Sequence, residues 1–148
     1  MGTPYEKIYT KFLKRIEDTS LPSFTREEQI AMLTEWLDTA MSYIELDCLE
    51  LKNDLSNRDN DLQDFGEELT VTEQELIAMY MVVAWYEPRI NSLETTLMFV
   101  GSKDEKWTAQ KDQLKMQTEK RDYWKSEARK YFRNYCYQHN SYLDGGNS

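Results

Sequence analysis

Residues 76–86, LIAMYMVVAWY, are apolar on nearly every side of a helix, and Pro88 follows almost at once. A helix without a polar face is normally central to a bundle or buried in an assembly. Because proline lacks a backbone N–H and disfavours α geometry at the preceding Glu87, we expect this helix to stop or kink there, with Arg89 emerging at the bend. Apolar spacing then resumes towards Gly101, a predicted C-terminal cap, through Ile90, Leu93, Leu97 and Val100.

The composition favours long helices elsewhere in the chain too. The 148 residues are 30% charged and include only five glycines and three prolines, which argues against many short strands. We therefore predict an all-α protein, an antiparallel helical bundle with a Pro-kinked central helix and a long C-terminal helix. The expected divisions are a bundle domain over residues 1–101, a helical extension over 102–142 and a flexible tail over 143–148.

Four helix starts are indicated by a Ser or Thr followed three residues later by Glu, the pattern of a capping box. In this arrangement the hydroxyl and the carboxylate each accept a hydrogen bond from an orphan backbone N–H. Pro4 is expected at the first helical position, ahead of an apolar stripe over residues 5–16. The four pairs are Thr3 with Glu6, Thr25 with Glu28, Thr70 with Glu73, and Ser102 with Glu105.

A second helix is predicted over about residues 25–52, and an acidic connector follows over 53–66. The connector, NDLSNRDNDLQDFG, is rich in residues that favour turns, so we expect a solvated loop. The connector does not match an EF-hand calcium loop. If Gly66 is placed at the sixth position of such a loop, Thr72 falls at the twelfth, where a bidentate Glu is needed. The inner face of the helix is expected to contain Ile30, Leu33, Trp36, Leu37, Ala40, Met41, Ile44 and Cys48.

A helix of about 38 residues is expected from Ser102 onward, a rod on the order of 55 Å long. Its apolar row is interrupted by Gln110, Gln117 and Arg121, so the helix should lean on another element. Its aromatic and cationic residues have a composition enriched at protein interfaces, although packing within the chain remains open. The candidate partner-contacting residues are Trp124, Tyr131, Arg133 and Tyr135.

The formal charge of −9 is unevenly distributed along the chain. Residues 1–102 contain 8 basic and 20 acidic side chains, a net −12, whereas residues 103–133 contain 10 basic and 6 acidic, a net +4. Such an acidic chain is not expected to bind nucleic acid as its main activity, although mimicry of DNA stays open. Opposite patches suit head-to-tail contacts between identical subunits. A solvated acidic surface is the alternative.

Catalytic chemistry finds little support in the sequence. The only histidine, His139, lies near the C-terminus without a nucleophile partner, and no glycine-rich phosphate loop is present. Cys48 and Cys136 lack metal-ligand spacing, and no apolar run of about 18 residues occurs. We expect a soluble, intracellular protein with free thiols that is not an enzyme and has no catalytic site, metal, cofactor or membrane span.

Three segments carry a resemblance to a known family. Residues 69–92, 25–45 and 5–18 resemble the helices of head-to-tail connector, or adaptor, proteins of long-tailed bacteriophages. The family's pattern of a small residue, a bulky residue, Tyr and, three positions later, Arg is matched here by Val83, Ala84, Trp85, Tyr86 and Arg89. The family usually ends soon after its third or fourth helix, whereas this chain continues with a long basic helix.

The resemblance implies a helical virion protein of the phage neck. Such subunits form a dodecameric ring beneath the portal, extend the DNA channel and offer a platform to the tail, after assembly in the host cytoplasm. DNA would pass without specific binding, because an acidic channel repels phosphates. The portal and neighbouring neck or tail proteins are the implied partners.

Two sets of site residues are expected. Trp85, Tyr86 and Arg89 would hold the bundle or adjoining subunits, and the aromatic and basic residues of the C-terminal helix would contact the portal. A tail-completion, or stopper, protein is one alternative. Another is a small acidic inhibitor or regulator of a host protein, which an exposed cluster of acids would favour: Asp47, Glu50, Asp54, Asp59, Asp61 and Asp64.

Overall fold

The computed structural model describes residues 2–18, 20–47, 51–99 and 105–139. Four helices dominate the described chain: α1 (Tyr5–Leu13), α2 (Arg26–Leu46), α3 (Val71–Phe99) and α4 (Glu105–His139). A short 3-10 turn (Leu21–Ser23) precedes α2, and a small hairpin of β1 (Arg58–Asp59) and β2 (Asp64–Phe65) precedes α3. The prediction of an all-α bundle with a long C-terminal helix is confirmed.

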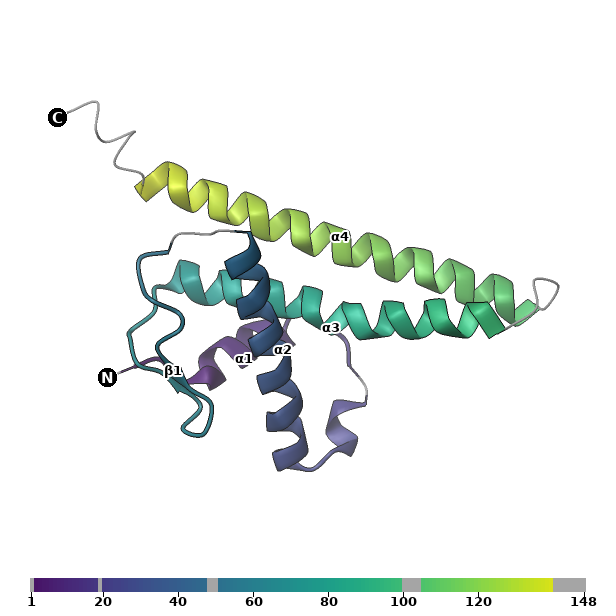
Figure 1. The fold of residues 1–148 in the computed structure, drawn as a ribbon, viewed down its shortest axis with the longest axis horizontal. Coiled ribbons are helices and arrows are strands. Elements are labelled where there is room, and N and C mark those ends of the chain that lie inside the picture. Colours follow the sequence, from purple (N-terminus) through teal and green to yellow (C-terminus); the bar gives the residue numbers. More distant parts are fainter. Residues whose placement is uncertain (1, 19, 48–50, 100–104, 140–148) are drawn as a thin grey trace.

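Helix α3 is the centre of the fold, as its apolar run predicts. The other three helices all pack against it, and residues 76–86 are all buried. Figure 1 shows α1 and α2 against one half of α3, while α4 returns antiparallel along its length. Beyond Ile90 no residue of α3 is buried, so the last third of α3 and the start of α4 form a projecting helical arm.

Pro88 does not end α3. The helix runs through it to Phe99 as one element, so the expectation of a stop is wrong. Pro88 itself is exposed, so its ring meets solvent instead of the core. The Arg89 side chain donates from Nη1 to the carbonyl oxygen of Trp85 at 2.9 Å. The proline itself removes the backbone donor that would pair with the Ala84 carbonyl four residues earlier. Gly101 and Val100 lie outside the described residues.

Two of the four predicted capping boxes are present. Thr25 and Glu28 exchange both hydrogen bonds at the start of α2, and Thr70 and Glu73 do so at the start of α3. The box at Thr3 is wrong. Its hydroxyl accepts from the N–H of Leu69 at 2.8 Å and donates to the Glu67 carbonyl, and Pro4 is the residue before α1. The box at Ser102 lies outside the described residues.

The connector before α3 differs from the solvated loop that we expected. Helix α2 ends at Leu46 instead of near residue 52, and the hairpin buries Phe65 completely. The N–H of Phe65 donates to the Thr3 carbonyl at 2.8 Å, so the hairpin is fastened to the chain entering α1. The predicted inner face of α2 is otherwise correct, while Cys48 lies outside the described residues. Its buried residues are Leu33, Trp36, Leu37, Ala40 and Ile44.

Candidate functional site

A hydrogen-bonded cluster just beyond the end of α1 centres on one carboxylate, that of Asp18, whose side chain is only 3% exposed. Its Oδ2 accepts from Trp85 Nε1 and from Arg89 Nη2, both at 2.9 Å. Its Oδ1 accepts from the N–H of Ser20 at 2.9 Å. Trp85 and Arg89, two of the predicted site residues, therefore bind the segment between α1 and α2 to α3 of the same chain.

Electrostatics favour the charged form of this pair. Burial raises the pKa of Asp18, but hydrogen bonds from Ser20 and Trp85 and the charge of Arg89 outweigh it, so the pKa lies below its usual value. Burial lowers the pKa of Arg89, although a guanidinium remains charged at neutral pH. Of the two groups only the Asp18 carboxyl titrates in an accessible pH range, and its lowered pKa keeps it charged at neutral pH.

The third residue of this set, Tyr86, is 7% exposed and packs edge-to-face on Trp85, with ring centroids 4.8 Å apart. Burial raises the pKa of the Tyr86 hydroxyl. Tyr86 and Trp85 also form one wall of a cleft of about 370 Å³ between the end of α1, α3 and α4, which we call the aromatic cleft. Its lining residues are Arg15, Glu17, Trp85, Tyr86, Met116, Gln117, Lys120, Tyr123 and Trp124.

The opposite wall of the aromatic cleft comes from α4. Tyr123 and Trp124 pack edge-to-face at 5.4 Å, and Tyr123 is 57% exposed. The Gln117 Oε1 atom is buried and has no hydrogen-bond partner in the part of the chain that the structure describes. An apolar and aromatic cleft with a few polar groups is the usual form of a binding site.

Cations contribute to the rim of the aromatic cleft. The Arg15 guanidinium lies 5.9 Å from the Trp124 ring centroid and also pairs with Glu75, which Lys11 binds at 2.9 Å. Burial raises the pKa of Glu75, but these two cations outweigh it and hold the pKa below its usual value. Lys120 is exposed at the rim.

The four predicted partner residues of α4 do not form one surface. Trp124 and Tyr131 are partly buried against the core, and Tyr135 stacks with Phe132 at 6.2 Å between ring centroids. Arg133 is exposed and lines a separate hollow on α4 with Lys125 and Arg129, among others. Sequence reasoning thus combined residues from two sides of one helix.

The tip of the hairpin is a feature that sequence reasoning missed. Gln63 has a left-handed backbone with φ of 56°, which non-glycine residues rarely adopt. It is held by hydrogen bonds with Tyr9, Thr34 and Asn60 and through its carbonyl with the N–H of Tyr5. The connector's turn residues could indicate a tight turn, but no local pattern indicated these partners.

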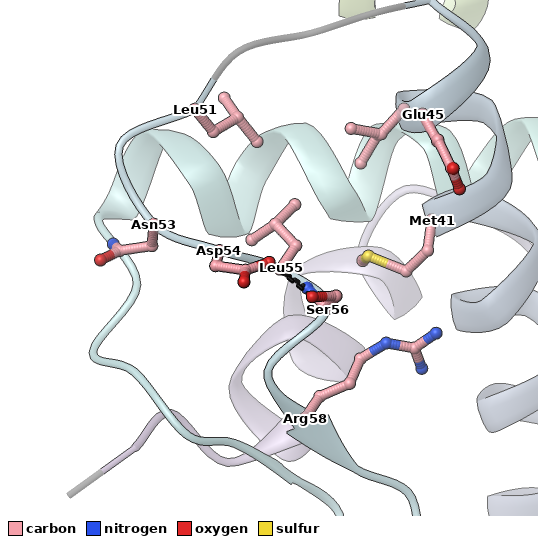
Figure 2. A pocket seen from close by; sticks show the side chains of 9 residues that line it. Met41, Glu45, Leu51, Asn53, Asp54, Leu55, Ser56 and Arg58 are labelled. Atoms are coloured by element: carbon pink, nitrogen blue, oxygen red, sulfur yellow. Dashed lines mark hydrogen bonds between the residues drawn. The ribbon is translucent and has the colours of Figure 1, made fainter.

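A larger hollow of about 590 Å³ lies between α2 and residues 51–58 (Figure 2). Met41 and Leu55 give it an apolar lining, while Arg58 binds Asp38 on α2 at 2.5 Å. We assign it no ligand.

The acids that would favour an inhibitor are in part engaged within the chain. Asp47 accepts from the Tyr80 hydroxyl at 2.5 Å and pairs with Arg129 at 3.5 Å. Asp54 accepts from the N–H and the hydroxyl of Ser56 at 3.0 and 2.6 Å. Glu50 lies outside the described residues.

Within the described segments, no group of three or more His, Cys, Asp or Glu side chains could hold a metal ion. None of the helices in these segments is long and apolar enough to cross a membrane. Cys136 is a free thiol, and the side chain of His139 lies outside the described part.

Comparisons of this chain with protein-family models, with curated proteins and with solved structures found no match.

Proposed function

We propose that the chain is a non-enzymatic virion protein of the bacteriophage neck, a ring-forming adaptor between the portal and the tail. The observation that carries this proposal is the α3–α4 arm. At its end the neighbouring side chains Met98 and Phe99 are 82% and 85% exposed. Large adjacent apolar side chains at a projecting tip are suited to burial by a partner, because burial removes their apolar surface from water.

The charge distribution supports the same proposal. The basic residues of α4 and the acidic residues of the remaining chain give one subunit two parts of opposite net charge. A heterologous contact joins two different surfaces and closes into a ring when the rotation fits. The acidic surface would repel phosphates in a DNA channel, so that the genome passes without specific binding.

The site residues take distinct roles in this proposal. Trp85 and Arg89 hold the segment after α1 on α3 through Asp18, and therefore maintain the shape of the subunit. The exposed Arg133 and the partly buried Tyr135 remain candidates for contact with the portal. Trp124 and Tyr131 would instead hold α4 in place, since both pack against the core.

Native mass spectrometry of the chain, alone and with the neighbouring portal protein, tests the proposal. We expect a complex with about twelve copies of the chain on one portal ring. The double variant Met98→Ser with Phe99→Ser, at the end of the α3–α4 arm, should reduce the number of bound copies. The control Val71→Ser, at a residue that is 65% exposed, should not. A chain that stays monomeric and ignores the portal contradicts the proposal.

A further inference from the structure

The hairpin tip combines an apolar side chain with two carboxylates. Leu62 borders a hollow between α1 and α2, yet it is 71% exposed. Asp59 and Asp61 are exposed beside it, and Asp59 Oδ1 accepts from the N–H groups of Asp61 at 2.8 Å and Leu62 at 3.1 Å. These bonds and those of Gln63 fix the shape of the tip. A fixed shape lowers the entropy cost of binding.

The aromatic cleft offers the complementary chemistry. Its walls are aromatic, and its volume of about 370 Å³ exceeds that of one leucine side chain. Lys120 brings an exposed cation to it, and Arg15, which also pairs with Glu75, brings a second; Glu17 is the acid in the lining. The unpartnered Gln117 Oε1 could accept a hydrogen bond from a backbone N–H of an entering loop.

The tip and the cleft cannot meet within one copy of the chain. The tip is fastened to the start of α1, where the Tyr5 N–H donates to the Gln63 carbonyl at 2.8 Å. The cleft begins at Arg15, beyond the end of α1 at Leu13. The nine residues of α1 separate the two by about 14 Å along the helix. Two complementary surfaces at opposite ends of one helix can join only different molecules.

We propose that the hairpin tip of one copy docks in the aromatic cleft of the next, with Leu62 between the aromatic walls and its flanking carboxylates against Lys120 and Arg15. This inference deepens the proposed function and rests on it, because it identifies the two surfaces that join neighbouring subunits. The contact is heterologous. A copy that has docked through its tip still has a free cleft, so further copies can be added.

Sedimentation velocity on two complementary variants tests this contact. The tip variant combines Asp61→Asn with Leu62→Ser, and the cleft variant combines Lys120→Gln with Tyr123→Ala. All four residues are exposed, so thermal melts should show that both variants fold. Each alone should associate at least about tenfold more weakly than the unchanged chain, because each loses apolar burial and a charge pair.

An equimolar mixture of the two variants is the decisive measurement. The intact tip of the cleft variant should dock in the intact cleft of the tip variant, giving one-to-one dimers and nothing larger. Val71→Ser and Lys115→Glu serve as controls and should associate as the unchanged chain does. If the chain assembles only on the portal, fewer copies of either variant than of the unchanged chain should bind to the portal ring.

The outcomes separate the two proposals. If the chain forms rings and both variants form them equally well, the tip-to-cleft contact is overturned while the neck function stands. If both variants lose assembly but their mixture gives no dimer, the contact is also overturned. If the unchanged chain neither self-associates nor joins the portal, the contact and the proposed function both fail.

Discussion

The guanidinium of Arg89 lies over the indole of Trp85, with Cζ 3.8 Å from the ring centroid, and both side chains donate to the same carboxylate oxygen of Asp18. The stacked pair therefore presents two donors in a fixed geometry. Because Asp18 follows α1 and the pair belongs to α3, this contact couples the first connection of the chain to the central helix.

Removing the shared acceptor should weaken the fold. We expect Asp18→Ala to lower the free energy of unfolding by about 1–3 kcal/mol, since it leaves the indole N–H and a half-buried guanidinium without their partner. Urea denaturation measures the change. Glu17→Ala, at the exposed neighbouring residue, is the control and should stay within about 0.5 kcal/mol. Equal losses for the two variants would contradict this role of Asp18.

Stability should fall in acid because of depressed carboxyl pKa values. The pKa values of Asp18 and Glu75 are lowered in the folded chain, so the unfolded chain binds protons first as the pH falls. Their contribution is present above the ordinary values near 4 and is lost as the pH falls through the folded values. Melting temperature between about pH 6 and pH 2.5 measures it, and Asp18→Ala should flatten the curve.

An opposite dependence is expected in alkali. Burial raises the pKa of Tyr9 to about 12, and the neighbouring Thr34 hydroxyl only partly offsets it. The unfolded phenol ionises near pH 10, so this contribution is present below that pH and is lost between about pH 10 and pH 12. The urea midpoint should fall between pH 8 and pH 11, and this fall should be smaller for Tyr9→Phe than for the unchanged chain. An equal fall in both would count against this origin.

The two confirmed capping boxes should differ in energy. Glu73 is fully buried and its carboxylate also accepts from the N–H of Asn53 at 2.9 Å and from its amide at 2.6 Å. Glu28 is exposed and bonds only within its box in the described structure. We expect Glu73→Ala to cost about 2–3 kcal/mol and Glu28→Ala less than about 1 kcal/mol, in urea denaturation. Similar costs would show that burial of the box adds nothing.

Replacing the proline inside α3 should stabilise the chain. Pro88→Ala restores a backbone donor in a continuous helix and removes little packing, because Pro88 is exposed. We expect the free energy of unfolding to rise by about 1–2 kcal/mol. The higher helix preference of alanine outweighs the greater conformational freedom that alanine gives the unfolded chain. Thermal melts measure it, with the exposed Glu94→Ala as control. A lower melting temperature would mean that the packing of α3 depends on the proline.

Sequence patterns predicted the elements whose signals are local. The apolar run of α3 required burial whatever surrounds it, and the boxes at Thr25 and Thr70 involve only neighbours along the chain. The hydroxyl of Thr3 is different, because its partners are residues 67 and 69, which no local pattern relates to it. Asp47, just beyond the last turn of α2, likewise has distant partners in Tyr80 and Arg129.

The candidate site was predicted only in pieces. Trp85 and Trp124 were assigned to separate surfaces, yet both line the aromatic cleft, because α4 returns along α3 in a register that the sequence does not encode locally. Asp18 was overlooked for the same reason, since its partners lie 67 and 71 residues away along the chain. The hairpin tip depends on Gln63, whose backbone is held by distant side chains.

The bond between Thr3 and Leu69 also sets an order of events during synthesis. The two residues are 66 positions apart, so Thr3 has no partner until roughly 3–13 s after it is made, at about 5–20 residues per second. A nine-residue helix such as α1 is marginal by itself in water. We therefore expect the first helix to become stable only after Leu69 has left the ribosome, and its apolar stripe to stay open to chaperones until then.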